Sequence, residues 1–226
     1  MDDEHQSKLT KQKIAWAQQR RGATEREDGV AARLNPTAPD ADRPRLPPGQ
    51  HLAKGFPVLD LGIQPEIALE RWSLSIHGLV ENPIEWDWRE FLAQPQTEAV
   101  SDFHCVTSWS TFDNRWTGVA FRHLLAQVRP QAAARFVYLI SHDGYSTNLP
   151  LAVVDDADVL IAHAWNGQPL AREHGGPARL VAPKRYAWKS AKWLKEIVFL
   201  AQDRLGYWEV RGYSNSADPW QEERYA

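Results

Sequence analysis

Residues 158–170, which read DVLIAHAWNGQPL, place a run of mostly apolar residues directly before Asn166-Gly167. A short apolar run bounded by a turn signal predicts a buried strand, here at 158–165. Asn-Gly is the strongest short-range signal for a two-residue hairpin turn. The chain should therefore reverse at this point and return as a second strand through residues 168–170.

Working outward, short strands dominate the remaining pattern. One helix is predicted after Asp87, whose capping-box partner is Glu90, and a second, amphipathic helix is predicted at 119–128. Further strands are predicted at 72–77, 97–105, 135–141 (followed by a turn at 142–144), 179–182 and 195–201. Strands and helices do not alternate regularly, so we expect an α+β fold of mixed sheets with a barrel-like core and short helices.

Composition divides the chain into an arm and one domain. The 226 residues are 43% hydrophobic, enough for one sizeable core. Residues 1–50 are polar and then rich in Ala, Arg, Asp and Pro, and within them 5–21 allow a polar helix with little apolar face. We expect 1–50 to be an arm or linker, partly disordered or wrapped on the surface, and 51–226 to be the globular domain.

Charge and patterning argue against several classes of protein. The formal net charge of −3 disfavours a general nucleic-acid binder. No apolar run approaches the roughly 18 residues of a membrane helix, so an integral membrane protein is not expected. The polar start MDDEHQSKLTKQK lacks the apolar core of a secretory signal, which predicts a cytoplasmic protein.

Cys105 is the one cysteine in the chain, and it stands where the strand at 97–105 is predicted to enter a polar loop. A lone cysteine can simply be a buried, inert thiol. A zinc site is disfavoured because no second cysteine exists. His104 is a poor catalytic base for this thiol, because neighbouring side chains on a strand point to opposite faces. A lone thiolate suits a soft metal whose other ligands come from a cofactor.

Residues 174–195 contain no acidic residue and six cations: Arg179, Lys184, Arg185, Lys189, Lys192 and Lys195. Gly175-Gly176 would let the backbone approach a ligand, and Lys189-Ser190-Ala191-Lys192 offers the groups of an anion site. A solvated basic face is the simpler interpretation. Because Tyr186, Trp188 and Trp193 are interspersed with the cations and the whole chain is mildly acidic, we favour an anionic ligand. The eleven tryptophans fit either core packing or aromatic walls around such a site.

These features together resemble the molybdopterin domain of the sulfite oxidase family. The resemblance rests on His104-Cys105-Val-Thr-Ser-Trp109-Ser110, on Gly-Gly-Pro-x-Arg at 175–179 and on Trp188-Lys-Ser-Ala-Lys192, and it covers roughly residues 51–226. The small haem-free bacterial branch, which includes the molybdopterin subunit of the methionine sulfoxide reductase system, is the more similar one.

The resemblance implies roles for individual residues. Cys105 would be the thiolate ligand of molybdenum in a molybdenum–molybdopterin cofactor, with no haem. The expected cofactor-binding residues are Phe56 (in the loop 54–58), His104, Ser141, His174, Arg179, Ser190, Ala191 through its backbone, and Lys192. The expected substrate-pocket residues are Trp109, Arg115, Tyr145 and Trp188.

The expected activity is a two-electron oxo-transfer or dehydrogenation of a small substrate, such as a sulfur or nitrogen oxide. Electrons would pass to or from a separate partner, because no redox domain is evident. Thr107 stands where methionine sulfoxide reductases carry an acid, so the substrate stays open. Three alternatives remain: a non-catalytic anion- or nucleotide-binding module, a Cys–His hydrolase, and a single-stranded nucleic-acid binder.

Overall fold

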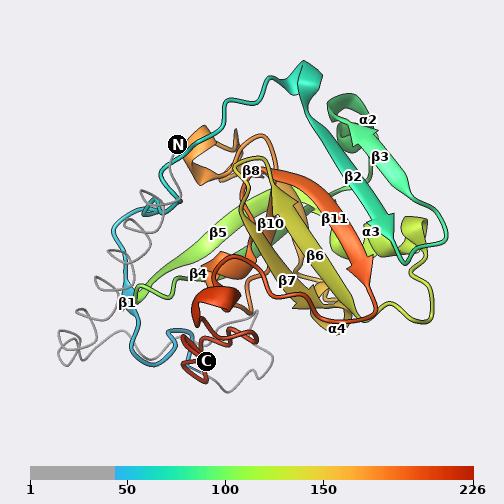
Figure 1. Cartoon of the computed structure of the whole chain (residues 1–226). Helices are drawn as coiled ribbons and strands as arrows, with labels where there is room; N and C mark the ends of the chain where they lie inside the picture. Colours follow the sequence, from blue (N-terminus) through green and yellow to red (C-terminus); the bar gives the residue numbers. More distant parts are fainter. Residues whose placement is uncertain (1–43) are drawn as a thin grey trace.

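A computed structural model describes residues 44–226 of the chain (Figure 1). These residues form two mixed β-sheets with a few short helices at their edges, which confirms the predicted α+β class. Most of the arm predicted at 1–50, including the polar helix allowed at 5–21, lies outside the described residues, so the boundary near residue 50 stays a prediction.

The first sheet is organised around one long strand, β5. Its strands are β1 (His51–Leu52), β4 (Gln96–His104), β5 (Trp109–Ala120), β8 (Leu160–Trp165), β9 (Gln168–Pro169) and β10 (Arg179–Val181). Strand β5 pairs antiparallel with β4 and β8 and parallel with β1. The sheet therefore brings together segments that lie more than 100 residues apart in the sequence.

The second sheet has the strand order β3-β2-β11-β6-β7. Its strands are β2 (Ser73–Gly78), β3 (Ile84–Asp87), β6 (Phe136–Ser141), β7 (Ser146–Pro150) and β11 (Leu194–Leu200). Strands β2 and β11 run parallel and the other pairs are antiparallel. Strand β11 leads directly out of the basic segment, so this sheet anchors one side of the predicted anion site.

The helices are short. The α-helices are α2 (Trp88–Ala93), α3 (Phe121–Val128) and α4 (Leu151–Val154), and the 3-10 helices are η1 (Leu69–Arg71), η2 (Arg172–His174), η3 (Ala187–Lys189) and η4 (Glu209–Arg211). At the start of α2 the Asp87 carboxylate accepts from the Glu90 amide, and the Glu90 carboxylate accepts from the Asp87 amide. This confirms the predicted capping box.

The hairpin at Asn166-Gly167 is also confirmed. Trp165 pairs with Gln168, and both turn residues have positive φ values of 50° and 76°. Such values are what a two-residue hairpin turn of this type requires.

Strand β5 was not anticipated from the sequence, which suggested a polar loop after Cys105. In the structure that loop is a tight turn of four residues, and the chain then runs extended for twelve residues from Trp109 to Ala120. The helix predicted from Val119 begins instead at Phe121, because Val119 and Ala120 still pair with β8. Strands β3 and β7 were likewise not predicted.

Two clusters of buried side chains form the core. The larger one lies around the second sheet and includes Trp72, Phe91 and Ile197. The smaller one contains Cys105, Trp109 and the aromatic residues packed around them.

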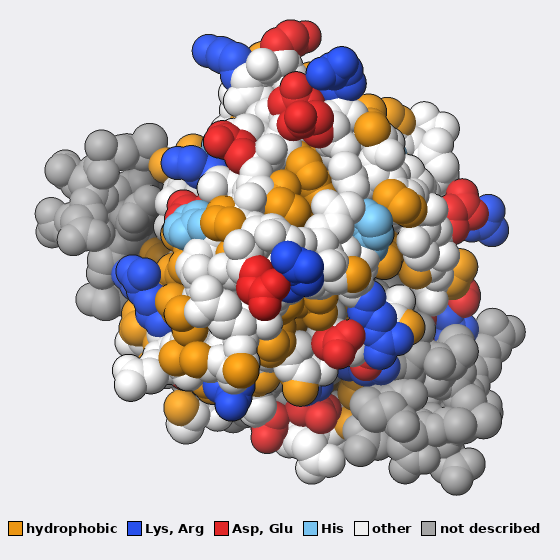
Figure 2. All heavy atoms as spheres, turned by 90° about the vertical axis from the view of Figure 1, so that its right-hand side faces the viewer, with side chains coloured by type: hydrophobic (Ala, Val, Ile, Leu, Met, Phe, Trp, Pro, Cys, Tyr) orange, Lys and Arg blue, Asp and Glu red, His pale blue; other side chains and the backbone are white. Residues whose placement is uncertain are grey.

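The face on the right of Figure 1 carries positive and negative side chains interspersed with apolar ones, without a continuous patch of one sign (Figure 2).

The described end of the arm is part of this packed structure. Arg45 is buried and forms a two-pronged ion pair with the buried Asp102 on β4, with Nε and Nη2 at 2.7 and 2.6 Å from the carboxylate oxygens. Planar pairing of this kind is the strong form of the Arg–carboxylate interaction. Residues from 44 onward are thus fixed against the first sheet.

Gly118 provides a test of how closely β5 and β8 approach. A Cβ atom at this position would lie 2.1 Å from the Ile161 carbonyl oxygen, which is backbone and cannot swing away. We expect Gly118→Ala to lower the free energy of unfolding by about 3 kcal/mol, the upper part of the usual range for overpacking, as measured by urea denaturation. Gly167→Ala is the comparison, because nothing lies within 4 Å of a Cβ there and the variant has only the strain of a side chain at φ +76°, about 1–2 kcal/mol; an equal loss in both variants would contradict the close approach.

Candidate cofactor site

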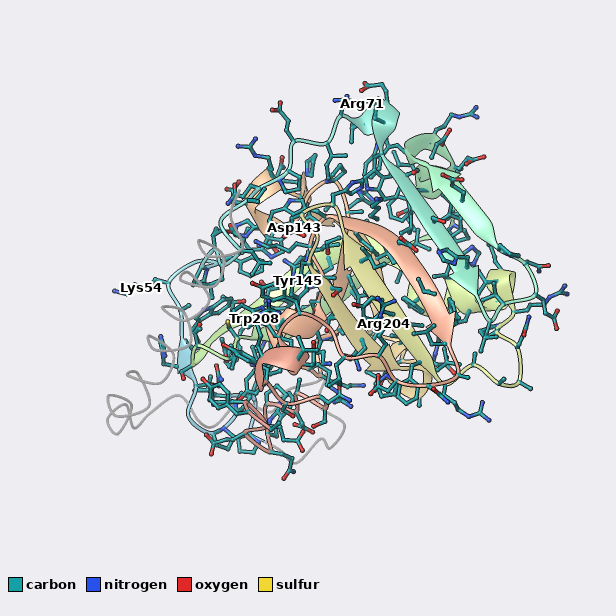
Figure 3. The ribbon with its side chains drawn as sticks, in the orientation of Figure 1. Lys54, Arg71, Asp143, Tyr145, Arg204 and Trp208 are labelled. Atoms are coloured by element: carbon teal, nitrogen blue, oxygen red, sulfur yellow. The ribbon has the colours of Figure 1, made fainter. Side chains whose placement is uncertain are left out.

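A cavity opens where the turn between β4 and β5 meets the turn between β6 and β7 and the basic segment, and its walls come from segments spread over the whole domain. It is lined by Phe56, Pro57, Val58, Leu59, Asp60, Leu61, Phe103, Cys105, Val106, Thr107, Trp109, Asp143, Tyr145, His174, Arg179, Ala187, Trp188, Ser190, Lys192, Trp193, Trp208 and Tyr213. Figure 3 shows three of them, Asp143, Tyr145 and Trp208, one below the other beside the second sheet. The residues predicted to hold a metal and an anion thus meet at one mostly apolar cavity.

Cys105 enters the cavity from the turn between β4 and β5. The Cys105 amide donates to the Trp109 carbonyl at 2.8 Å, and the Ser108 amide donates to the Cys105 carbonyl at 3.0 Å. Cys105 is 5% exposed, and its Sγ lies 3.2 Å from Thr107 Oγ1. Burial raises the pKa of this thiol, so a positive ion in the cavity would be needed to favour the thiolate.

Arg179, on β10, is a buried cation without a carboxylate partner among residues 44–226. Its guanidinium donates to three backbone carbonyls, those of Leu180, His174 and Ser190, at 2.9–3.2 Å. The residue is 3% exposed, and burial lowers its pKa to about 9. A buried charge normally requires a partner of opposite sign, which an anion in the adjoining cavity would supply.

Ser190 and Lys192 stand beside Arg179 at the cavity wall. The Ser190 hydroxyl accepts from the Ala182 amide at 3.0 Å, which leaves its own proton available for a ligand. Lys192 donates from Nζ to the Glu173 carbonyl at 2.7 Å and lies over the Trp193 ring. These two side chains and Arg179 give this end of the cavity its positive character.

The Gly175-Gly176 step has a different role from the one predicted. A Cβ atom on Gly175 would lie 2.9 Å from the Lys192 side chain, and one on Gly176 would lie 2.2 Å from the Leu170 carbonyl oxygen. The glycines are therefore explained by packing within the chain, which places Lys192 at the cavity, and not by approach to a ligand.

His174 and Phe56 form one aromatic wall. Their rings stack with centroids 4.5 Å apart at an interplanar angle of 11°. Burial, together with the nearby Arg179, lowers the pKa of His174, so its ring is neutral at pH 7. Phe56, Pro57 and Val58 line the cavity, as expected for the loop at 54–58.

Lys189 does not belong to the anion site, contrary to the expectation from its sequence neighbourhood. It is completely buried, with Nζ 2.7 Å from Glu209 Oε1 and 3.0 Å from both oxygens of Asn148. The same Glu209 oxygen accepts from Trp188 Nε1. Lys184 is likewise paired, with Asp156 and Asp158. Acidic residues distant in sequence thus neutralise part of the basic segment.

We expect Lys189→Met to lower the free energy of unfolding by about 3–5 kcal/mol, because it leaves the Glu209 carboxylate buried and unpaired. Urea denaturation measures this loss. Lys195→Met removes the same charge from an exposed position on β11 and should change stability by no more than about 0.5 kcal/mol. If Lys189→Met had unchanged stability and weaker anion binding, Lys189 would belong to the anion site after all.

Four of the predicted site residues do not line the cavity. His104 is fully buried and hydrogen-bonds with Ser110 Oγ on the other side of β4, where burial lowers its pKa to about 3. Arg115 is exposed on β5, so the geometry corrects its placement in a substrate pocket. Ala191 is buried, and its carbonyl accepts from Leu180. Ser141 is buried at the end of β6, and its hydroxyl has no hydrogen-bond partner among the described residues.

The sequence did not indicate several residues that line the cavity. Tyr213 and Trp208 pack against each other with ring centroids 4.7 Å apart, and Tyr213 also meets Trp188 edge to face. Their signal was the density of aromatic residues between 207 and 213. Asp143 was assigned only to a turn, but burial raises the pKa of its carboxyl at the cavity wall.

The arrangement fits a metal–pterin phosphate cofactor. One thiol is available for the metal, and a buried guanidinium with Ser190 and Lys192 is available for an anionic group. Trp109 Nε1 is a buried donor on the cavity wall without a hydrogen-bond partner in residues 44–226. A buried polar group of this kind is normally satisfied, so a bound ligand with an acceptor would explain it.

Comparison with known proteins agrees with this interpretation. Residues 61–208 match the family model for the oxidoreductase molybdopterin binding domain. The chain is 41% identical over 182 residues to the uncharacterized oxidoreductase YuiH of Bacillus subtilis, covering 80% of this chain and 92% of that protein. It is 28% identical over 155 residues to the protein-methionine-sulfoxide reductase catalytic subunit MsrP of Ralstonia nicotianae, covering 62% of this chain and 46% of that one.

Among solved structures, the sulfane dehydrogenase SoxCD from Paracoccus pantotrophus has a similar fold. Its TM-score is 0.57 at 24% identity, over 62% of this chain and 40% of that chain. The family match spans most of the domain that carries Cys105 and Arg179. The chain therefore belongs to the sulfite oxidase-type family of molybdopterin-binding oxidoreductases.

Proposed function

We propose that the protein uses a molybdenum–molybdopterin cofactor for a two-electron oxo-transfer or dehydrogenation of a small substrate, and exchanges electrons with a separate redox partner. The observation that carries the proposal is that Cys105 and the uncompensated guanidinium of Arg179 face one cavity. When bound, the cofactor supplies a metal that can change its oxidation state by two electrons, which no side chain of the chain offers.

The chain's own residues would bind and shield this cofactor. Cys105 would donate its thiolate to the metal, while Arg179, Ser190 and Lys192 would bind the phosphate. Phe56 and His174 would contact the pterin. The aromatic side chains of Trp109, Tyr145, Trp188 and Tyr213 would exclude water from the reacting centre.

For the substrate we favour a small sulfur or nitrogen oxide. The support is the similarity to a protein-methionine-sulfoxide reductase catalytic subunit, although the chain spans less than half of that relative. The walls that remain after the cofactor-binding residues are assigned are mostly aromatic or aliphatic, which suits a small molecule with an apolar part.

The hydrolase alternative receives no support from the geometry. The Cys105 thiol hydrogen-bonds with Thr107, and no histidine in residues 44–226, including His174 in the same cavity, hydrogen-bonds with it. A nucleophilic cysteine needs a base within hydrogen-bonding reach.

None of the helices in residues 44–226 is long and apolar enough to cross a membrane. The cytoplasmic location stays a prediction.

Elemental and pterin analysis of the protein, expressed in a host that makes the cofactor, tests the proposal. We expect about one molybdenum per chain, followed by turnover of at least one substrate in a screen with sulfite, S-oxides and N-oxides. A folded protein without molybdenum or pterin would contradict the proposal and favour the anion-binding module.

A further inference from the structure

The turn that carries Cys105 accepts hydrogen bonds from residues near both ends of the described chain. The Cys105 carbonyl, besides its bond within the turn, accepts from Gln50 Nε2 at 3.1 Å. The next carbonyl, that of Val106, accepts from Arg224 Nη1 at 2.5 Å. The His51 amide donates to the Ser108 carbonyl at 3.0 Å. Three of the four residues of the turn are thus fixed by residues near the two ends of the described chain.

Gln50 is well suited to this task. It is buried, and its Oε1 accepts from the Ser110 hydroxyl at 3.2 Å while its Nε2 donates to Cys105. Both ends of the amide are thereby engaged on the two sides of the turn. A side chain held at both ends loses little further freedom and transmits its position to what it binds.

Arg224 is a second buried arginine, and its one ion pair among residues 44–226 is long. Its nearest acid is Glu222, at 3.9 Å and half exposed, and its guanidinium also donates to the Gly49 carbonyl and lies 5.1 Å from the Tyr186 ring centre. Gly49 has φ +66°, and a Cβ there would lie 2.8 Å from Glu222 Oε1 and 3.2 Å from Arg224 Nη2. The glycine therefore leaves room for both side chains beside the Cys105 turn.

The two ends also bind each other. Trp220 Nε1 donates to the Pro44 carbonyl at 3.0 Å, and Figure 1 shows the C-terminal segment beside the start of the described chain. Gln50 and Arg224 both lie outside the range 61–208 that matches the family model. The support for the proposed metal ligand thus comes from segments that the shared domain does not include.

We propose that Gln50 and Arg224 are positioning residues for the molybdenum ligand: they fix the backbone on which Cys105 stands, and Arg224 places a positive charge on the carbonyl of the residue that follows Cys105. The inference rests on the proposed function. Groups that hold a metal ligand in place commonly change metal affinity or activity by 10- to 100-fold when they are removed.

The test compares Gln50→Ala, Arg224→Gln and Arg224→Lys with wild type, and uses Arg89→Gln on the exposed side of α2 as the control for loss of one positive charge. The readouts are molybdenum content after dialysis, the thiolate-to-molybdenum absorption band, and the reduction potential of the metal. Thermal unfolding of each variant separates loss of the fold from loss of the ligand geometry.

We expect Gln50→Ala and Arg224→Gln to lose molybdenum 10 to 100 times faster than wild type and to shift the absorption band. Arg224→Gln should also lower the reduction potential, because removing a positive charge favours the more oxidised metal, whereas Arg224→Lys should keep the potential near that of wild type. Arg89→Gln should change none of the three.

Retention, band and potential equal to wild type in both Gln50→Ala and Arg224→Gln would overturn the inference. If Arg224→Gln does not fold, Gln50→Ala decides alone, because it removes one amide and no charge. A wild-type protein without molybdenum would instead contradict the proposed function, and the inference would fall with it.

Discussion

Cys105→Ser is expected to abolish turnover, by at least about a thousandfold, together with the visible thiolate-to-molybdenum absorption band. The thiol is the only sulfur of its kind in the chain, and it faces the cavity with Thr107 as its hydrogen-bond partner among the described residues. A serine oxygen is harder and far less acidic than a thiol, so it is a poor substitute for a soft thiolate ligand. Steady-state assays with the best substrate of the screen and an absorption spectrum measure the two losses.

The variant should still fold, because serine is nearly the same size and the turn is held by backbone hydrogen bonds that do not involve the side chain. Thr107→Val serves as the control for the thiol's surroundings: it removes the hydrogen bond but keeps the ligand, and should retain the band. A Cys105→Ser protein that keeps both the band and turnover would exclude Cys105 as the metal ligand.

Local pattern was sufficient for much of the fold. The strand at Ser73–Gly78, the capping box at Asp87 and the hairpin at Asn166-Gly167 are all determined by residues within a few positions of one another. Such short-range signals can be interpreted without knowledge of the tertiary structure. Strand β5 could not be predicted in this way. Asp113, Asn114 and Gly118 in its middle disfavour a strand, and its pairing with β4 and β8 overrides that preference.

The site was predicted best where a residue's role follows from its own chemistry. Cys105 and Arg179 both line the cavity, and Arg179 has the buried, uncompensated charge that an anion would satisfy. Lys189 was assigned wrongly because its partner Glu209 lies twenty positions away, and nothing local indicates that pairing. His104 was assigned to the cofactor by resemblance although strand alternation already directed its ring away from Cys105, and Arg115 lies on strand β5, which was not predicted.

Gln50 and Arg224 could not be predicted from the sequence as residues of the site. They lie at opposite ends of the described chain and both bind the Cys105 turn. Neither their type nor their neighbours suggests a role near a metal. Functional support that is assembled from distant segments becomes visible only in three dimensions.

Arg179→Met is expected to weaken cofactor retention by at least a hundredfold. Removing one partner from a buried charge pair costs about 3–5 kcal/mol, and each 1.4 kcal/mol corresponds to a factor of ten in the dissociation constant. Arg179→Lys keeps the charge but loses the planar fork that holds three carbonyls and an anion at once, so it should fall between wild type and Arg179→Met. Molybdenum and pterin content after dialysis measures the effect.

The cofactor-free protein separates anion binding from a purely structural role for this arginine. Inorganic phosphate should raise the melting temperature of wild-type apoprotein, because an anion that binds only the folded state stabilises it. The rise should be absent in Arg179→Met and retained in Arg172→Met, whose arginine is exposed in the same segment. Equal stabilisation of all three proteins by phosphate would show that the anion binds elsewhere, and the buried guanidinium would then need another explanation than the cofactor.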